Sequence, residues 1–255
     1  MRTNISDRDG LVAWAGLLLI PLLFVAGSGR AVPRRPGPQA AGGSAAAFPL
    51  QPGTYWIYEA VARWGPANSS SPQEKLFHWK MAVHQVIHRG DLLVAVVTGF
   101  PRDLDRSHGD ARPARSLIIE AGGSKFYWIP PASFAETLAR LKNPKDSLGG
   151  LTDADEIFLD LPLTDGKKFC GPTGMVRTDG FYCWVVGEPE VAQLGEAKGI
   201  PAGATTAYPV HFLTVDDSTS FDFVPGVGIT RYSFQTHGTI NDTELRLLEF
   251  HAGSR

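Results

Sequence analysis

The chain has 255 residues, of which 43% are hydrophobic and 20% are charged, and these ordinary globular proportions exclude a chain that is disordered throughout. The formal net charge is −2, and no cluster of Lys and Arg stands out in the part expected to fold. A nucleic-acid partner is therefore not expected, because proteins that hold phosphate backbones present a basic surface.

The N-terminus carries an apolar segment, residues 11–27, which reads LVAWAGLLLIPLLFVAG and has no charge. Arginines precede it, and small residues near position 27 would permit cleavage, so residues 1–27 are predicted to be a secretory signal peptide. Three further arginines within residues 28–35 argue for the alternative, a retained N-terminal anchor, because positive charge after an apolar segment resists translocation. Both readings predict an exported protein that is periplasmic, secreted or anchored to the outer face of the inner membrane.

Residues 28–47 are rich in Gly, Pro and Ala and lack the apolar side chains that would offset the entropy of ordering. They are predicted to be a flexible tether. A single β-rich domain is expected to follow over residues 48–251.

That domain opens on an alternating pattern. On one side of residues 53–64 lie Trp56, Tyr58, Ala60, Ala62 and Trp64, which is typical of a half-buried strand. Turn residues at 89–91 and 122–124 predict hairpins between neighbouring strands. The predicted strands are 53–64, 75–88, 92–100, 116–121, 125–129, 181–186, 205–215, 220–224, 229–234 and 244–250.

One helix interrupts the strands, at about residues 133–142. The pattern S-x-x-E at Ser133 predicts its capped start, and Asn143-Pro144 predicts its end. Residues 92–97 and 126–129 are apolar on both faces, so these strands need cover on both sides. The fold class predicted is therefore mainly β, with a strongly curved antiparallel sheet or an open or partial barrel and one short mid-chain helix.

A motif occurs twice. Residues 48–56 read F-P-L-x-x-G-x-x-W, and residues 161–169 read L-P-L-x-x-G-x-x-F. Gly53 and Gly166 are predicted to form the turn into a strand at each place. The repeat indicates either two similar strand starts or two related half-domains, 48–129 and 161–251. Two more glycines, Gly226 and Gly228, are interpreted as sites of strand bending.

The chain has two cysteines, Cys170 and Cys183. In an exported protein such a pair predicts a disulfide. The turn signals between them do not lie midway, so a simple hairpin would not place them opposite each other. The bond therefore requires residues 171–182 to loop out, and free buried thiols remain the alternative.

Several of these motifs together resemble one family. The start F-P-L-x-x-G-x-x-W-x-Y at 48–58, the second copy at 161–169, the corner I-P-A-G at 200–203 and F-V-P-G-V-G-I at 223–229 are similar in order and spacing to the TapB-like family of secreted bacterial proteins. The resemblance covers roughly residues 48–250, although Phe169 stands where Trp is more usual. It implies a β-rich envelope domain akin to the open-barrel lipoprotein-carrier fold, and it transfers no catalytic residues.

Motifs that carry chemistry are weak. The sequence contains no G-x-S-x-G, H-E-x-x-H or phosphate-binding loop, so we predict no catalytic residue, metal ligand or cofactor. His78, His84 and His88 share a parity on one predicted strand but lie too far apart along it to share a metal ion. The acidic residues within 103–110 fail the calcium-loop spacing, and a solvated loop is expected.

Aromatic side chains leave two interpretations open. Trp56, Tyr58, Trp64 and Trp128 either fill the core or line a cavity for an apolar ligand. The function predicted is that of a non-catalytic exported envelope protein that binds an apolar ligand, a lipid or a protein partner, and that touches the membrane only through an uncleaved N-terminal segment. The alternatives are a periplasmic or secreted hydrolase without a recognisable motif, and a structural or assembly component of the envelope.

Overall fold

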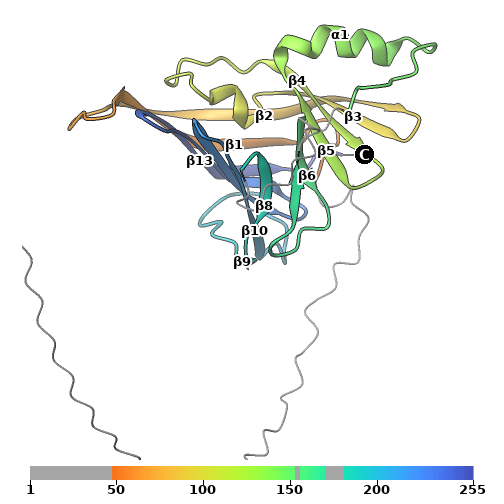
Figure 1. The fold of residues 1–255 in the computed structure, drawn as a ribbon. Helices are drawn as coiled ribbons and strands as arrows, with labels where there is room; N and C mark the ends of the chain where they lie inside the picture. Colours follow the sequence, from red (N-terminus) through yellow and green to blue (C-terminus); the bar gives the residue numbers. More distant parts are fainter. Residues whose placement is uncertain (1–47, 153–155, 171–180, 255) are drawn as a thin grey trace, which may run out of the picture. The chain divides into compact units, whose positions relative to one another are not determined.

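A computed structural model describes residues 48–152, 156–170 and 181–254 (Figure 1). The predicted signal segment and tether, residues 1–47, lie outside this part of the chain. Among the residues described, no helix is long and apolar enough to cross a membrane.

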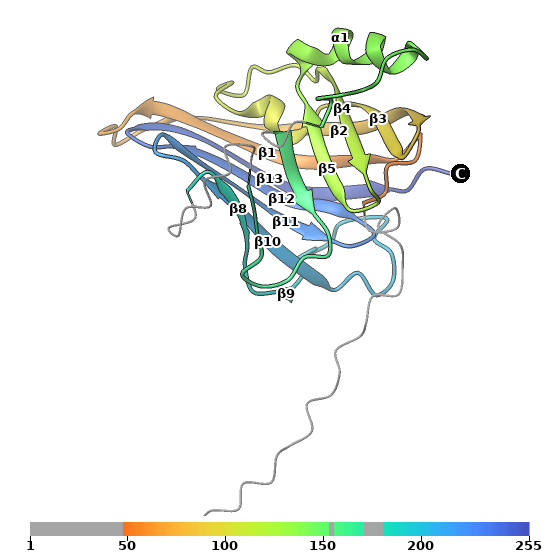
Figure 2. The same ribbon diagram turned by 45° about the vertical axis from the view of Figure 1, so that its right-hand side comes forward.

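The fold is a strongly curved antiparallel sheet that closes almost into a barrel (Figures 1 and 2). Twelve strands follow one path, β6-β5-β4-β3-β2-β1-β13-β12-β11-β10-β8-β7, and β9 pairs only with β10. The predicted fold class is confirmed. The strands are β1 Tyr55–Pro66, β2 Gln73–Arg89, β3 Leu92–Thr98, β4 Arg115–Ala121, β5 Lys125–Ile129, β6 Ile157–Asp160, β7 Lys168–Cys170, β8 Cys183–Val186, β9 Glu190–Val191, β10 Thr206–Leu213, β11 Asp217–Val224, β12 Gly228–Thr236 and β13 Thr239–His251.

The first and second halves of the chain meet along two seams of the barrel. The contacts that join them differ between the two seams. β1 and β13 pair along their whole length, from Tyr55 opposite His251 to Pro66 opposite Thr239. At the other junction, β6 and β7 are the two ends of the path. The Trp184 indole N–H on β8 donates to the Ile157 carbonyl on β6 at 2.7 Å, so side-chain contacts hold this seam.

The predicted strand ranges do not include three short strands, β6, β7 and β9, although a strand start after Gly166 was predicted where β7 lies. They have four, three and two residues, too few to show a period-two pattern. β3 also ends at Thr98, before the predicted position 100. Gly99 has a φ of +70°, which turns the chain out of the strand.

The helix α1 (Pro131–Lys142) begins two residues before the predicted start. Pro131 occupies the first helical position, where its fixed φ suits the helix and its missing N–H is not needed. Ser133 therefore lies inside the first turn, and its amide donates to the Pro130 carbonyl at 3.0 Å. The helix packs against β4 and β5 (Figure 2) with Leu141 buried, and so supplies cover for β5, one of the two strands predicted to be apolar on both faces.

The middle of the barrel is packed with aromatic rings. Phe48, the first residue described, has four rings within 5.7–6.2 Å of its own centroid, those of Trp56, Phe126, Phe158 and Phe223. A Phe158–Phe100 contact at 5.2 Å and a Phe100–Trp128 stack at 5.5 Å extend this cluster. The sheet therefore encloses a packed centre rather than one continuous cavity.

The repeated motif has the same hydrogen bonds in both copies. The Gly53 amide donates to the Val83 carbonyl at 2.9 Å, and the Gly166 amide donates to the Val186 carbonyl at 2.9 Å. Each valine amide donates back to the carbonyl of the residue after the glycine, at 2.8 and 2.9 Å. Both glycines have positive φ, +85° and +72°. The two strand starts are thus locally equivalent, and each opens one six-strand half of the path.

Cys170 and Cys183 form a disulfide, as expected in outline. The two residues are direct partners at the ends of β7 and β8, so strand pairing continues up to the bond. Residues 171–180 between them lie outside the described residues.

Candidate functional site

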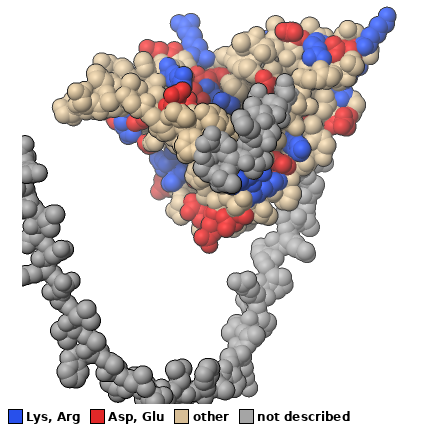
Figure 3. Space-filling model, in the orientation of Figure 1, with Lys and Arg blue, Asp and Glu red and all other residues tan. Residues whose placement is uncertain are grey.

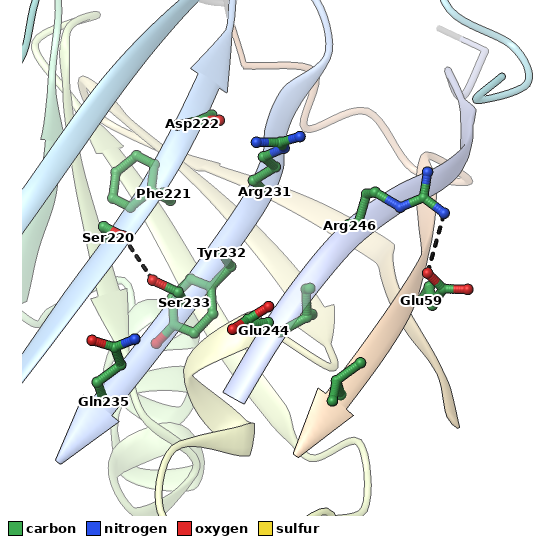
Figure 4. Close-up of a pocket in the computed structure, with 12 residues that line it drawn as sticks. Glu59, Ser220, Phe221, Asp222, Arg231, Tyr232, Ser233, Gln235, Glu244 and Arg246 are labelled. Atoms are coloured by element: carbon green, nitrogen blue, oxygen red, sulfur yellow. Dashed lines mark hydrogen bonds and ion pairs between the residues drawn. The ribbon is translucent and has the colours of Figure 1, made fainter. Parts of the chain in front are cut away.

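Three hollows in the described part of the chain could hold a ligand. The outer groove, of about 510 Å³, lies on the outer face of β1, β13, β12 and β11 (Figure 4). The apolar recess, of about 460 Å³, lies where the segment before β1 meets β2, β3 and β4. The loop recess, of about 270 Å³, lies between the loop that follows β3 and the strands β5, β10, β11 and β12.

Two pairs of polar side chains that line the outer groove contact each other. Arg246 contacts Glu59 at 3.1 Å across β13 and β1, and the hydroxyls of Ser220 and Ser233 lie 2.8 Å apart across β11 and β12 (Figure 4). Exposed pairs of this kind contribute little stability and keep a sheet face hydrated. Figure 3 likewise shows charged side chains of both signs over the visible face, with uncharged surface between them. We interpret the groove as a solvated outer surface.

The apolar recess has a different lining. Buried Phe48 and Leu50 contribute to it, and half-buried Val86 and Leu93 face it from β2 and β3. The polar or exposed contributors are Gln51, Pro52, His88 and Glu120. This combination of apolar walls with a few polar groups is the usual composition of a small-molecule site.

A β-bulge at His84 gives the recess two of its residues. The pairing of β2 with β3 shifts between Val83 and Gln85, which inserts one extra residue into β2. The inward side therefore changes from odd positions, such as Val83, to even positions, Val86 and His88. The prediction that His78, His84 and His88 share one side of the strand is therefore wrong. The extra residue at the bulge exchanges the two sides of β2 for all residues that follow it.

The loop after β3 is not the solvated loop that the sequence indicated. It begins with a short 3-10 helix, Pro101–Leu104, whose Leu104 is fully buried. Burial raises the pKa of Asp103 to about 6 and that of Asp105 to about 7. Only Asp110 behaves as expected, since it is exposed and pairs with Lys75 at 2.9 Å. Because the loop is polar in composition, its folding into the barrel could not be predicted from the sequence.

The four aromatic residues predicted as core or cavity lining occupy different surroundings. Trp56 and Tyr58 are fully buried, and their side chains donate hydrogen bonds to backbone carbonyls of the segment before and at the start of β12. Trp64 is half-buried and stacks on His108 with ring centroids 5.7 Å apart. Trp128 is half-buried and lines the loop recess.

The four glycines predicted at turns or bends all have positive φ. The values are +85° for Gly53, +72° for Gly166, +82° for Gly226 and +99° for Gly228. The residues of the apolar recess were not singled out from the sequence. The signal available for them was the doubly apolar run at 92–97, which marks a strand with cover on both sides. Over the described residues, no group of three or more His, Cys, Asp or Glu side chains is placed to hold a metal ion.

Comparisons with known proteins leave the family open. No protein-family model matches the sequence, and no curated protein shows significant similarity to it. A solved structure of a protein described as exported, with a YmcC-like fold, from Bacteroides fragilis NCTC 9343 is 13% identical and covers 80% of this chain and 98% of its own, with a TM-score of 0.35. A protein described as a lipoprotein from Parabacteroides distasonis ATCC 8503 is 12% identical, covers 80% and 97%, and has a TM-score of 0.31. Scores this low assign neither family nor function, so the TapB-like resemblance stays a prediction.

Proposed function

We propose that the protein is an exported, non-catalytic envelope protein that binds an apolar ligand in the apolar recess. The observation that carries this proposal is the recess itself, with about 460 Å³ of space bounded mainly by apolar side chains. Small-molecule sites commonly have volumes of ~300–1,000 Å³ and such a lining. Each Å² of apolar surface that the ligand removes from water contributes roughly 25 cal/mol.

The packed centre of the barrel limits what the recess can take. Phe48 lines the recess and also belongs to the central aromatic cluster, so a ligand cannot pass beyond it into the barrel without displacing that cluster. We therefore propose a single acyl chain or a small hydrophobic ring system rather than a whole multi-chain lipid. The polar atoms of Gln51 and His88 at the recess suit a ligand with one polar end.

A matched pair of variants on β3 tests this function. Leu93 lines the recess, whereas its neighbour Leu92 points to the other face of the same strand, and both side chains are half-buried. The fluorescent apolar probe N-phenyl-1-naphthylamine would be titrated into the full-length protein and into Leu93→Gln and Leu92→Gln. We expect Leu93→Gln to weaken probe binding by about tenfold, because a buried amide without a partner costs ~1–3 kcal/mol.

Leu92→Gln should leave the dissociation constant of the probe almost unchanged. Competition by a free fatty acid should then displace the probe from the unaltered protein. Failure of the probe to bind, or equal losses in the two variants, would refute binding in the apolar recess.

A further inference from the structure

The loop recess combines flat apolar surface with positive charge. Its lining is contributed by the loop after β3, by β5 and by the three strands β10 to β12 on the opposite wall. The lining residues are Arg102, Asp105, Arg106, Trp128, Phe212, Asp217, Thr219 and Phe234. Three aromatic rings and two guanidinium groups therefore surround about 270 Å³ of space.

Buried polar atoms without a partner occur on two of the residues that line the recess. Across the described residues, four buried side-chain atoms have no hydrogen-bond partner, and all belong to the 3-10 helix or to β4 and β5: Arg102 Nε, Asp103 Oδ1, Ser116 Oγ and Trp128 Nε1. Arg102 Nε and Trp128 Nε1 are N–H donors on residues that line the recess. Both of these atoms are shielded by the groups around them, so a ligand in the recess would meet instead the terminal nitrogens of the Arg102 guanidinium, whose side chain is 31% exposed.

The Arg102 guanidinium is positioned by contact with an aromatic ring, and its Nε has no hydrogen-bond partner. It lies 4.8 Å from the centroid of the Trp128 ring, so the cation is placed over an aromatic face. Its Nε is 3.8 Å from Asp105 Oδ2, too long for a hydrogen bond. Asp105 instead accepts a hydrogen bond from the Tyr232 hydroxyl at 2.6 Å.

The second guanidinium has a different role. Arg106 pairs with Asp217 at 2.6 Å and so ties the loop to the start of β11. Its guanidinium also lies 5.9 Å from the centroid of the Phe234 ring. Arg106 and Asp217 neutralise each other, so the positive charge open to a ligand is that of Arg102, whose ion pair with Asp105 is longer, at 3.8 Å.

We propose that the loop recess is a binding site for a small aromatic carboxylate. Its carboxylate oxygens accept hydrogen bonds from the terminal guanidinium nitrogens of Arg102, and its ring lies against Phe212 and Phe234. Charge-assisted hydrogen bonds of this kind are the strong ones, and aromatic contacts add to them. The volume limits the ligand to one or two fused rings. This site is separate from the apolar recess and does not depend on the function proposed for that recess.

Affinity at this site should depend on pH. Arg102, Arg106, Tyr232 and Asp217 are the charged and titratable groups around Asp105, and burial raises the pKa of its carboxyl to about 7. As pH rises through that value Asp105 becomes an anion and repels a carboxylate that stays ionised throughout. Binding should therefore be tighter at pH 6 than at pH 8.

The test uses 2-naphthoate and its neutral isostere 2-naphthamide with the full-length protein. Calorimetric titration should show about tenfold or tighter binding of the naphthoate, since a hydrogen bond to a charged group contributes ~1.5–3 kcal/mol. Naphthoate should also shift one indole N–H resonance, identified as that of Trp128 by its loss in Trp128→Phe, a variant that keeps an aromatic ring. Arg102→Gln should remove the preference for naphthoate, whereas Arg246→Gln in the outer groove should not.

Three results would overturn the proposal. One is that naphthoate and naphthamide bind equally or not at all. Another is that the Trp128 indole resonance stays unmoved at saturation. The third is that Leu93→Gln abolishes naphthoate binding while Trp128→Phe does not, because the probe would then occupy the apolar recess.

Discussion

The indole N–H of Trp56 donates a hydrogen bond to the carbonyl of Val227 at 2.6 Å, across a sequence separation of 171 residues. Two residues further along each segment, the Tyr58 hydroxyl donates to the Ile229 carbonyl at 2.9 Å. Burial raises the pKa of Tyr58, so its hydroxyl keeps the proton that it donates. The motif at the start of the domain and the F-V-P-G-V-G-I segment near its end are therefore two parts of one buried contact.

Removal of this contact should destabilise the domain. Trp56→Phe leaves the Val227 carbonyl without its partner and should cost about 1–3 kcal/mol of unfolding free energy. Trp56→Ala also empties a fully buried site and should cost about 3–5 kcal/mol. Urea denaturation measures both values. Trp64→Phe, at a half-buried position, serves as the control, and a loss there equal to that of Trp56→Phe would contradict this account.

Gly228 should not tolerate a side chain. Its φ is +99°, and a Cβ atom at this position would lie 2.8 Å from Cε2 of the Phe48 ring. Gly228→Ala should lose about 1–2 kcal/mol from the backbone conformation and about 1–3 kcal/mol from overpacking. Gly203→Ala is the matched control, because Gly203 has a φ of +85° but open space around it. Thermal melts that show equal losses for both would exclude a steric role for Phe48.

The disulfide should be present in the exported protein. Intact mass after alkylation without reductant should show no modified thiol, and reduction should expose two. The double variant Cys170→Ala, Cys183→Ala should lose about 3 kcal/mol, because the bond closes a short loop in the unfolded chain. Detection of two modified thiols without reductant would contradict the prediction.

Stability should fall as pH rises from about 4 to 7. The folded-state pKa of Asp105 is about 7 against an ordinary 3.8, so between these values the folded protein binds more protons than the unfolded chain. Asp105→Asn can still accept from Tyr232 and should flatten this slope in urea denaturations at pH 5 and pH 8. Asp146 provides the opposite case, because Arg140 lowers its pKa and its contribution is lost at acid pH. An unchanged slope in Asp105→Asn would show that another group titrates.

Export is predicted from the N-terminal apolar segment. Protein tagged after residue 255 should be recovered beyond the inner membrane, and its mass should report whether the chain is cut near residue 27. Deletion of residues 11–27 should retain the protein in the cytoplasm. Recovery of the unaltered protein in the cytosol with its N-terminus intact would contradict export.

Much of the fold could be predicted because alternation and turn chemistry act locally. Trp56, Tyr58 and Ala60 show one side of β1, and Gly90 and Gly122 show where hairpins turn, since a positive φ favours glycine whatever surrounds it. The doubly apolar runs at 92–97 and 126–129 indicated a sheet covered on both faces. The short strands β6, β7 and β9 showed no such alternation, because two to four residues form strands only when a neighbour supplies the partner groups.

The candidate sites could not be predicted in the same way. His88 reaches the apolar recess only because the bulge at His84 changes which side of β2 faces inward. Asp105 and Arg102 lie in a stretch whose composition is that of a solvated loop. The Asp105 carboxyl is accommodated within the barrel by the hydroxyl of Tyr232, which is distant in the sequence.

The sequence by itself determined that this is a mainly β domain with a curved sheet, one covering helix, paired cysteines and glycines at its turns. These properties depend on side-chain period, backbone freedom and neighbouring residues, all of which are local. Only the tertiary structure decided which aromatic residues pack the centre and which line a recess, and where unpaired donors gather. Those properties depend on bulges and on contacts between strands far apart in the chain. No pattern within a short stretch of sequence indicates the free energies of such contacts.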